Sequence, residues 1–270
     1  MVTISAKDLE LSYGQKTVLS ELSIEIPSGK ISSIIGPNGC GKSTLLKALS
    51  RILPADKGMV YLDGKLIQEL PTKEVAKRLA LLPQVQENLD GISVYDLVSY
   101  GRFPHQNAFG RLTDLDREKI AWALTETQTM AFAHTPLQSL SGGQRQRVWI
   151  AMALAQDTDI ILLDEPTTYL DMHHQLEVLE LLQRLNRDNG KTIVMVLHDL
   201  NHAARFSDYI IAMKDGHILQ EGSPEEVITV EHLRQLFAIE ADILPASHFG
   251  YPILATYTHA KPSTKNKEFP

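Results

Sequence analysis

Residues 36–44 read "GPNGCGKST", and this stretch constrains the fold more than any other part of the chain. It fits the pattern G-x-x-x-x-G-K-[ST], follows the apolar run "ISSII" at 31–35, and leads into a segment that we expect to be helical. Glycines allow a tight turn whose backbone N–H groups point inward, and the N-terminus of a helix adds positive partial charge. The sequence therefore predicts a strand, a loop that surrounds phosphate, and a helix, in this order.

The same motif assigns roles to single residues. Lys42 is expected to reach the β- and γ-phosphates of a bound nucleotide, and Ser43 is expected to bind magnesium. An incidental glycine-rich turn is the alternative, but it would not need a strand before it and a helix after it, so we expect ATP and Mg²⁺ as ligands. The predicted nucleotide contacts in this stretch are Gly36, Pro37, Asn38, Gly39, Cys40, Gly41, Lys42, Ser43 and Thr44.

Cys40 is the one cysteine of the chain, which excludes an internal disulfide and fits a reducing compartment. It lies inside the loop, between Gly39 and Gly41. A helix N-terminus and the neighbouring Lys42 both favour a thiolate, so we predict a pKa below the free value of about 8.5. Bound triphosphate is expected to cover this thiol and to protect it from thiol-reactive reagents.

Two acidic residues follow the apolar run "IILL" at 160–163. Asp164 ends a buried strand, where a charge is costly unless it serves a cation, and we expect it to act on magnesium through water. Glu165 is then placed to polarise the attacking water as a general base. Simple solvation at the end of a strand is the alternative, and it would be favoured if the phosphate-binding loop were missing.

His198 ends another apolar run, in "VLHDL", and is expected to contact the γ-phosphate and to orient the water. His198 and His202 also have the i, i+4 spacing of a helical metal pair, but the sequence offers no evident third ligand. We therefore interpret His202 as an ordinary residue on a helix face. The pair His173 and His174 is expected to be solvated.

Apolar runs bounded by polar residues predict buried parallel strands, and the helical patterns between them predict an α/β fold. Asp-Gly pairs that begin at Asp63 and Asp215 predict two antiparallel hairpins. The section from about 87 to 156 is expected to be a helical insertion in a single domain at 1–260, followed by an unfolded polar tail at 261–270. The predicted strands are 31–35, 79–83, 159–165 and 192–198, and the predicted helices include about 42–52 and 172–189.

The overall charge argues against a nucleic-acid partner. The net charge is −7, from 26 Lys and Arg against 33 Asp and Glu, and it gives no electrostatic footprint for DNA or RNA. The N-terminus shows no apolar signal-peptide core, and the longest apolar runs, such as "TIVMVL", are too short to cross a bilayer. If the protein works at a membrane, other chains must supply the spanning helices.

A second glycine-led helix start lies at 139–147, in "SLSGGQRQR". Ser141 is expected to cap a helix that runs through Ala155, and its hydroxyl and the amides of Gly142 and Gly143 form another anion site. One nucleotide does not need both sites on one chain. A head-to-tail dimer with twofold symmetry uses both, because each "SGGQ", which ends at Gln144, then closes on the γ-phosphate held by the other copy.

Together these motifs resemble the ATP-binding subunit of an ABC transporter, over about residues 3–245 and in the order of that family. "LSGGQRQR" resembles the signature motif, and "GPNGCGKST" and "IILLDEP" resemble the Walker A and Walker B motifs. The resemblance implies a P-loop ABC ATPase fold with a parallel core sheet, an antiparallel β subdomain and a helical insertion. It also implies an aromatic residue that stacks on adenine (Tyr13), a Q-loop glutamine that contacts magnesium and senses the membrane partner (Gln84), a D-loop aspartate (Asp171) and a switch histidine (His198).

The stretches "SYGRFPHQ" at 99–106 and "FGRLTDLDREKI" resemble importers of iron–siderophore complexes, in particular the ferric hydroxamate subfamily. This implies a peripheral ATPase at the cytoplasmic face of the cell membrane, with two permease subunits, which we expect to dock near Gln84 and 87–106. A substrate-binding lipoprotein is implied as an indirect partner. Import of haem or cobalamin stays open, because the substrate does not enter this subunit. A soluble ABC ATPase that acts on DNA or ribosomes is disfavoured by the single cassette, the lack of a heptad arm and the acidic balance.

Overall fold

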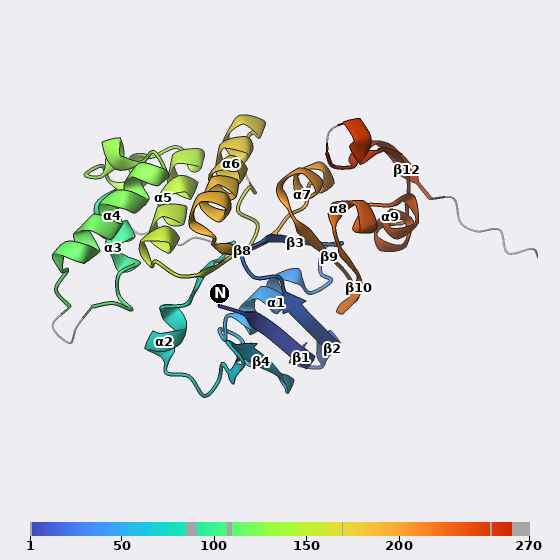
Figure 1. The fold of residues 1–270 in the computed structure, drawn as a ribbon, viewed down its shortest axis with the longest axis horizontal. Coiled ribbons are helices and arrows are strands. Elements are labelled where there is room, and N and C mark those ends of the chain that lie inside the picture. Colours follow the sequence, from blue (N-terminus) through green and yellow to red (C-terminus); the bar gives the residue numbers. More distant parts are fainter. Residues whose placement is uncertain (1, 85–90, 107–109, 169, 249, 261–270) are drawn as a thin grey trace, which may run out of the picture.

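A six-stranded sheet forms the centre of the computed structural model, which describes residues 2–84, 91–106, 110–168, 170–248 and 250–260 (Figure 1). The strand order is β10-β9-β3-β8-β7-β6. Four neighbouring pairs are parallel, and β10 pairs antiparallel with β9 at one edge. The strands are β3 (Ile31–Ile35), β6 (Leu79–Leu82), β7 (Ile160–Leu163), β8 (Thr192–Val196), β9 (Tyr209–Lys214) and β10 (His217–Gly222).

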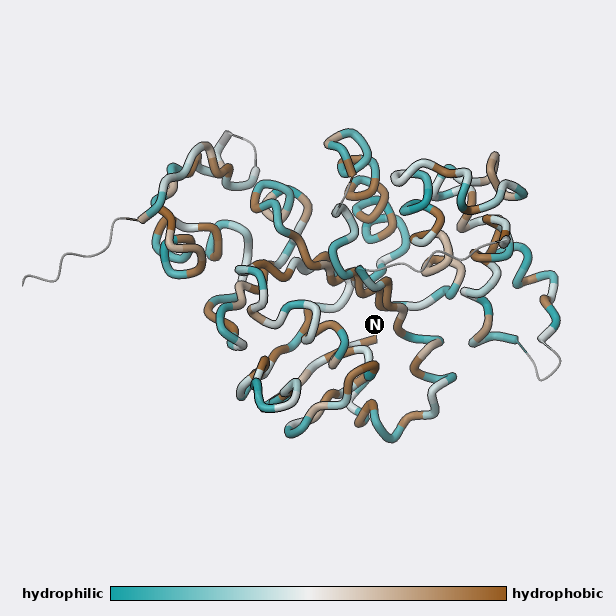
Figure 2. Tube along the Cα trace, turned by 180° about the vertical axis from the view of Figure 1, so that it is seen from behind, coloured by the Kyte–Doolittle hydropathy of each residue, from teal (hydrophilic) through white to brown (hydrophobic). Residues whose placement is uncertain are grey.

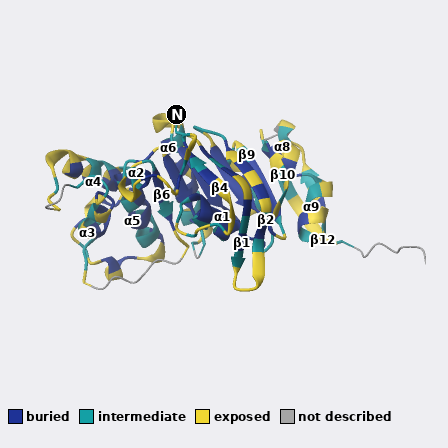
Figure 3. Cartoon of the chain, turned by 90° about the horizontal axis from the view of Figure 1, so that it is seen from below, coloured by how far each residue is buried: buried dark blue, intermediate teal, exposed yellow. Residues whose placement is uncertain are grey.

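The sheet is buried on both faces, because successive side chains of a strand point to opposite sides. In β8, Ile193 and Met195 join one apolar cluster, and Val194 and Val196 join the other. The hydrophobic band through the middle of Figure 2 and the buried strands in Figure 3 follow this sheet. Helices α5 (Gly142–Ala155), α6 (Met172–Asn189) and α7 (Leu200–Phe206) cover one face, and α1 (Lys42–Leu49) covers the other.

A second, antiparallel sheet packs beneath α1 in the order β2-β1-β4-β5. Its strands are β1 (Ile4–Tyr13), β2 (Lys16–Ile26), β4 (Lys57–Leu62) and β5 (Lys65–Leu66). The Asp63-Gly64 hairpin is confirmed, since β4 and β5 pair antiparallel and both turn residues have positive φ, 51° and 70°.

The described part of 91–156 is helical, with α3 (Val94–Tyr100), α4 (Asp114–Glu126), α5 and two short 3₁₀ turns at Met130–Phe132 and Leu137–Ser139. The short helix α2 (Thr72–Ala76) precedes β6. With the parallel core and the antiparallel sheet, these helices confirm the predicted α/β fold class. The predicted start of the insertion at residue 87 and the tail at 261–270 lie outside the described residues.

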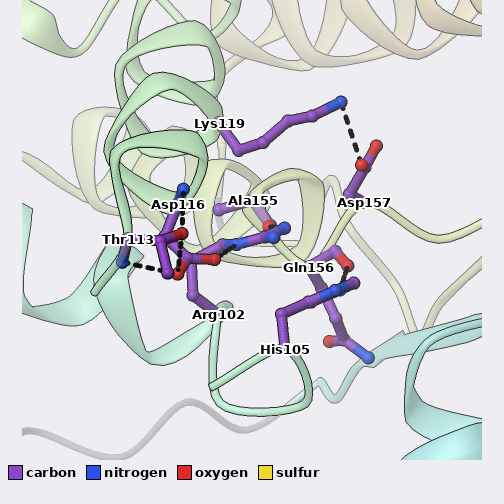
Figure 4. A network of polar contacts seen from close by, with 8 residues as sticks. All are labelled: Arg102, His105, Thr113, Asp116, Lys119, Ala155, Gln156 and Asp157. Carbon is purple, nitrogen blue, oxygen red and sulfur yellow. Dashed lines mark hydrogen bonds and ion pairs between the residues drawn. The ribbon is translucent and has the colours of Figure 1, made fainter. Parts of the chain in front are cut away.

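A buried ion pair joins two parts of the helical region (Figure 4). Arg102, just after α3, donates from Nε to Oδ1 of Asp116 at 2.8 Å and from Nη1 to the carbonyl oxygen of Ala155 at 2.7 Å. The two charged side chains are 2% and 3% exposed. Burial raises the pKa of Asp116, but hydrogen bonds from Thr113 and Arg102 outweigh it, so this pKa lies below its usual value. The pair ties the end of α3 to α4, and Arg102 links both to the C-terminal end of α5.

One helix ends earlier than expected, and other elements go beyond the expectations. The helix that starts at Lys42 ends at Leu49 rather than near residue 52, because Arg51 has a left-handed φ of 61°. The Asp215 hairpin is present, but its first strand β9 also continues the parallel sheet beside β3. The C-terminal elements were not predicted: α8 (Pro224–Val227), α9 (Val230–Phe237), β11 (Ile239–Leu244), a 3₁₀ turn (Ala246–His248) and β12 (Ile253–His259).

Along the residues that the structure describes, no helix has both the length and the apolar character needed to cross a membrane.

Candidate functional site

The glycine-rich loop connects β3 to α1 and is held tightly from behind. Gly36 and Gly41 have φ values of 148° and 105°, which side chains disfavour. A Cβ on Gly36 would lie 2.1 Å from the carbonyl oxygen of Met213, and a Cβ on Gly41 would lie 2.8 Å from Cδ2 of Leu19. A Cβ on Gly39 would meet nothing within 4 Å. The loop therefore packs against β9 and β2 on one side and leaves open space on the other.

Lys42, the first residue of α1, is buried and curls back over the loop. Its Nζ donates to the carbonyl oxygens of Gly36 at 2.9 Å and Pro37 at 3.0 Å. An ammonium group carries three N–H donors, so one remains for a phosphate oxygen beside the loop.

Ser43 and Asp164 place two oxygens together at the carboxyl end of the sheet. The hydroxyl of Ser43 donates to Oδ1 of Asp164 at 2.7 Å, and Asp164 is 4% exposed. Burial raises the pKa of Asp164, and the negative charge of Glu165 adds to this, against the opposing effects of Ser43, Lys47 and Lys42. Magnesium prefers oxygen ligands, and a cation would compensate this costly buried carboxylate, so the two residues fit the predicted metal.

Glu165 is the most extensively contacted carboxylate of the site. Its Oε1 lies 2.7 Å from Nε2 of His198. Its Oε2 accepts from Nε2 of Gln84 at 2.6 Å and from the hydroxyl of Thr168 at 2.9 Å. Burial raises the pKa of Glu165, but the hydrogen bonds from His198 and Thr168 and the charges of His198 and Lys42 lower it further, to below its usual value. Glu165 is therefore an ionised acceptor at neutral pH.

These side chains meet because each follows the carboxyl end of a parallel strand: β3, β6, β7 or β8. They enclose a cavity of about 650 Å³. Two of its lining residues, Val18 and Thr168, were not predicted; Thr168 lies two positions after Pro166, where the motif "IILLDEP" ends. The lining residues are Val18, Asn38, Gly39, Gly41, Lys42, Ser43, Thr44, Gln84, Glu165, Thr168 and His198.

Cys40 does not behave as expected. It is 4% exposed and packs in the apolar cluster below the loop, with Sγ 3.0 Å from the position that a Cβ on Gly36 would take. Burial raises the pKa of the thiol, and the charge of Lys42 does not offset it. The prediction of a lowered pKa is wrong because the desolvation of a thiolate outweighs the nearby positive charge.

Tyr13 ends β1 and is 51% exposed. An exposed ring at a strand end offers a free face for stacking, as the adenine prediction requires. It lies in the hairpin partner of β2, the strand that supplies Val18 to the cavity. The adenine contact of Tyr13 stays a prediction.

The second glycine-led start has the predicted cap. Ser141 accepts from the backbone N–H of Gln144 at 3.2 Å, and the side chain of Gln144 accepts from the backbone N–H of Ser141 at 3.0 Å. This capping box opens α5, which runs through Ala155 as expected. Within the described residues, the cavity lining contains none of the four residues of "SGGQ", so the two anion sites of the chain are separate.

Asp171 caps α6, where its Oδ1 accepts from the backbone N–H of His174 at 3.0 Å and lies 2.8 Å from Nδ1 of the same residue. These two hydrogen bonds hold the pKa of Asp171 below its usual value. His173 is solvated as expected, at 78% exposure, but the expectation for His174 is wrong. His174 is 32% exposed because its ring packs on Gly143. His202 lies on α7 with its ring against Phe206, as expected for a helix-face residue.

The sequence has close relatives of known role. The family described as "ABC transporter" matches residues 19–168. The chain is 55% identical over 257 residues to the iron(3+)-hydroxamate import ATP-binding protein of Bacillus subtilis (strain 168), with 95% of this chain and 96% of that protein covered. It is 45% identical over 263 residues to the ferric enterobactin transport ATP-binding protein of Escherichia coli (strain K12), with 97% of each covered.

Solved structures agree with the sequence comparison. A subunit of an ABC transporter in an inward-facing conformation superposes with a TM-score of 0.80 at 28% identity, over 95% of this chain and 96% of that one. A bacterial ABC transporter cassette, solved as a dimer, has a TM-score of 0.72 at 32% identity, over 82% of this chain and 98% of that one. With the phosphate-binding loop, the capped "SGGQ" helix and the Glu165 cluster in place, the chain belongs to the ABC transporter family, among its ATP-binding proteins.

Proposed function

We propose that this chain is the ATP-hydrolysing motor of an importer that carries iron(III)–siderophore complexes through separate permease subunits. One observation carries the ATPase part: the carboxylate of Glu165, held by three side chains beside the cavity that Lys42 and Ser43 line. The import part is supported by relatives whose names refer to iron(3+)-hydroxamate and ferric enterobactin.

The loop and its helix bind the triphosphate of ATP. Backbone N–H groups of residues 36–44 and the N-terminus of α1 face the phosphates. The remaining N–H donor of Lys42 binds the β- and γ-phosphates. Tyr13 stacks on adenine. Ser43 and Asp164, together with Gln84, would hold Mg²⁺, and the ion would supply positive charge beside the phosphates.

Hydrolysis needs a water that attacks the γ-phosphorus while the bond from that phosphorus to the bridging β–γ oxygen breaks. Glu165 accepts the proton of this water, and ADP and phosphate leave. His198 and Gln84 fix the two carboxylate oxygens, so the acceptor is aligned before the reaction begins. His198 also contacts the γ-phosphate from its place after β8.

A second copy of the chain completes each site. Ser141, Gly142, Gly143 and Gln144 of one copy close on the phosphates that the other copy holds, and Asp171 contacts the partner across the same interface. This arrangement explains why the two anion sites of one chain are separate. At the cytoplasmic face of the membrane, closure and reopening of the dimer move two permease subunits. These permease subunits receive the substrate from a substrate-binding lipoprotein.

A reconstitution experiment tests this function. The tagged chain is purified from detergent-solubilised membranes with the proteins that accompany it, and the complex is placed in vesicles with ATP on the side of this chain. We expect ATP-dependent uptake of an iron-labelled hydroxamate siderophore that stops with Glu165→Gln. ATP-dependent uptake of haem or cobalamin in place of the siderophore, or co-purification of ribosomes or DNA without permeases, would contradict the proposal.

A further inference from the structure

His174 lies between the two elements that the proposed dimer presents to its partner. It is the third residue of α6, directly after the loop that ends at Asp171, and its ring reaches the first turn of α5. The contact is close. A Cβ on Gly143 would lie 2.6 Å from Cδ2, 2.8 Å from Cγ and 3.2 Å from Nε2 of the ring.

The same ring is anchored at its other side. Its Nδ1 lies 2.8 Å from Oδ1 of Asp171, which also caps α6. Because Asp171 is an ionised carboxylate that can only accept, Nδ1 must carry the hydrogen of this bond. One imidazole therefore fixes the position of the Asp171 side chain while it packs on the backbone of Gly143.

A second contact ties the same two segments together. Gln146, one turn further along α5, donates from Nε2 to the carbonyl oxygen of Pro166 at 2.9 Å. Pro166 directly follows Glu165, so the start of α5 is linked to the segment 166–171 at both of its ends. The ring of His174 is the link at the Asp171 end.

We propose that His174 is a positioning residue that sets the distance and orientation between the signature glycines and Asp171, and so preforms the half-site that one copy offers to the ATP of the other. The proposal rests on the proposed function, because it needs the composite site of the dimer. The ring also explains why position 143 is a glycine, because a methyl group there would occupy the space of the ring.

The chain offers matched variants for a test. His174→Ala removes both the ring and the donor. His174→Asn keeps an N–H donor at the position of Nδ1 and an atom at the position of Cδ2. His173→Ala is the control, because the neighbouring histidine is 78% exposed, pairs with Glu177 and meets the His174 ring only edge-on, at 5.5 Å between ring centroids. All are made in the Glu165→Gln chain, which is expected to bind ATP and to stay dimeric.

The first measurement is the ATP-driven dimerisation constant, with ATP binding to the monomer as the second readout. A hydrogen bond to a charged group contributes enough that we expect His174→Ala to weaken dimerisation by about tenfold or more. ATP binding to the monomer should not change, because His174 does not line the cavity beside the loop at 36–44. His174→Asn should recover most of the loss, and His173→Ala should behave like the parent. Equal dimerisation of parent and His174→Ala would overturn the proposal, whereas a parent that stays monomeric in ATP would overturn the proposed dimer as well.

A double-mutant cycle tests the contact itself without ATP. Gly143→Ala should lower the melting temperature of the parent chain because the methyl group collides with the ring. The same substitution should lower it much less in the His174→Ala chain, where the space is free. An equal decrease in both backgrounds would show that the ring does not set the position of Gly143, and would overturn the proposal.

Discussion

Nε2 of His198 lies 2.7 Å from Oε1 of Glu165, although the two residues follow different strands of the central sheet. The other carboxylate oxygen accepts from Gln84 and Thr168. Both oxygens of the acceptor are thus fixed by side chains from separate elements. A carboxylate that is held in this way is aligned for proton transfer rather than free to rotate.

Glu165→Gln keeps the shape of the side chain and removes its capacity to take a proton. Since general base catalysis contributes typically about 10²–10⁴-fold, ATP hydrolysis should fall by this order while ATP binding persists. The measurement is steady-state phosphate release beside equilibrium binding of ATP. Glu118→Gln, on the exposed face of α4, is the control. Hydrolysis at the parental rate would show that another group accepts the proton.

Asp164→Asn should separate stability from activity. The pKa of Asp164 is raised by burial, so its ionised form destabilises the folded chain when the pH is above this pKa; the penalty shrinks as the pH falls below it and is gone below the ordinary pKa of an unfolded aspartate. The variant should therefore have a larger free energy of unfolding than the parent at neutral pH, and the gain should vanish in acid. Its ATP hydrolysis with Mg²⁺ should fall. Urea denaturation without nucleotide, at a series of pH values, measures the first effect; a gain that is the same at every pH would contradict it.

Arg102→Met should destabilise the chain by about 3–5 kcal/mol, because it leaves the buried carboxylate of Asp116 without its partner. Arg102→Met with Asp116→Asn should be less destabilised than the single variant, since Asn still accepts from Thr113 and carries no charge. Arg117→Met, in an exposed pair on the same helix, should change little. Urea denaturation of the three proteins checks the order. A double variant less stable than Arg102→Met would contradict the account of this pair.

Cys40 should react slowly with thiol reagents in the folded chain. The thiol is buried and its pKa is raised, so both access and the thiolate fraction are low. The rate of labelling, followed by mass spectrometry, should be much lower for the native protein than for the same protein in urea. Labelling of the native chain as fast as that of the unfolded chain would place the thiol at the surface of the loop.

The elements that the sequence predicts well have local signals at both ends. Helix α6 begins after a capping aspartate, Asp171, and ends before Gly190, whose φ is 63°. Helix α5 begins with the capping box of Ser141. The strand ends that carry Asp164, Glu165 and His198 follow short apolar runs, and parallel pairing brings them together. The meeting of Gln84, Glu165 and His198 follows from this topology.

The features that the sequence did not predict depend on contacts between distant segments. The sequence of β9 predicts a strand of the hairpin with β10, but it carries no local sign that β9 also pairs in parallel with β3. The position of Cys40 beside Lys42 favours a thiolate, whereas the burial that outweighs this charge follows only from the fold. Likewise, the ring of His174 is covered by Gly143, a residue of the preceding helix.

The mixed-dimer experiment tests the central claim, an ATPase whose sites each combine the loop of one copy with the signature of the other. Lys42→Ala and Ser141→Arg chains carry different tags, and heterodimers are isolated by both tags in sequence. In such a heterodimer one site carries both lesions and the other carries neither, so ATP hydrolysis should exceed that of either variant alone. Verified heterodimers that hydrolyse no more ATP than the two homodimers would contradict the account.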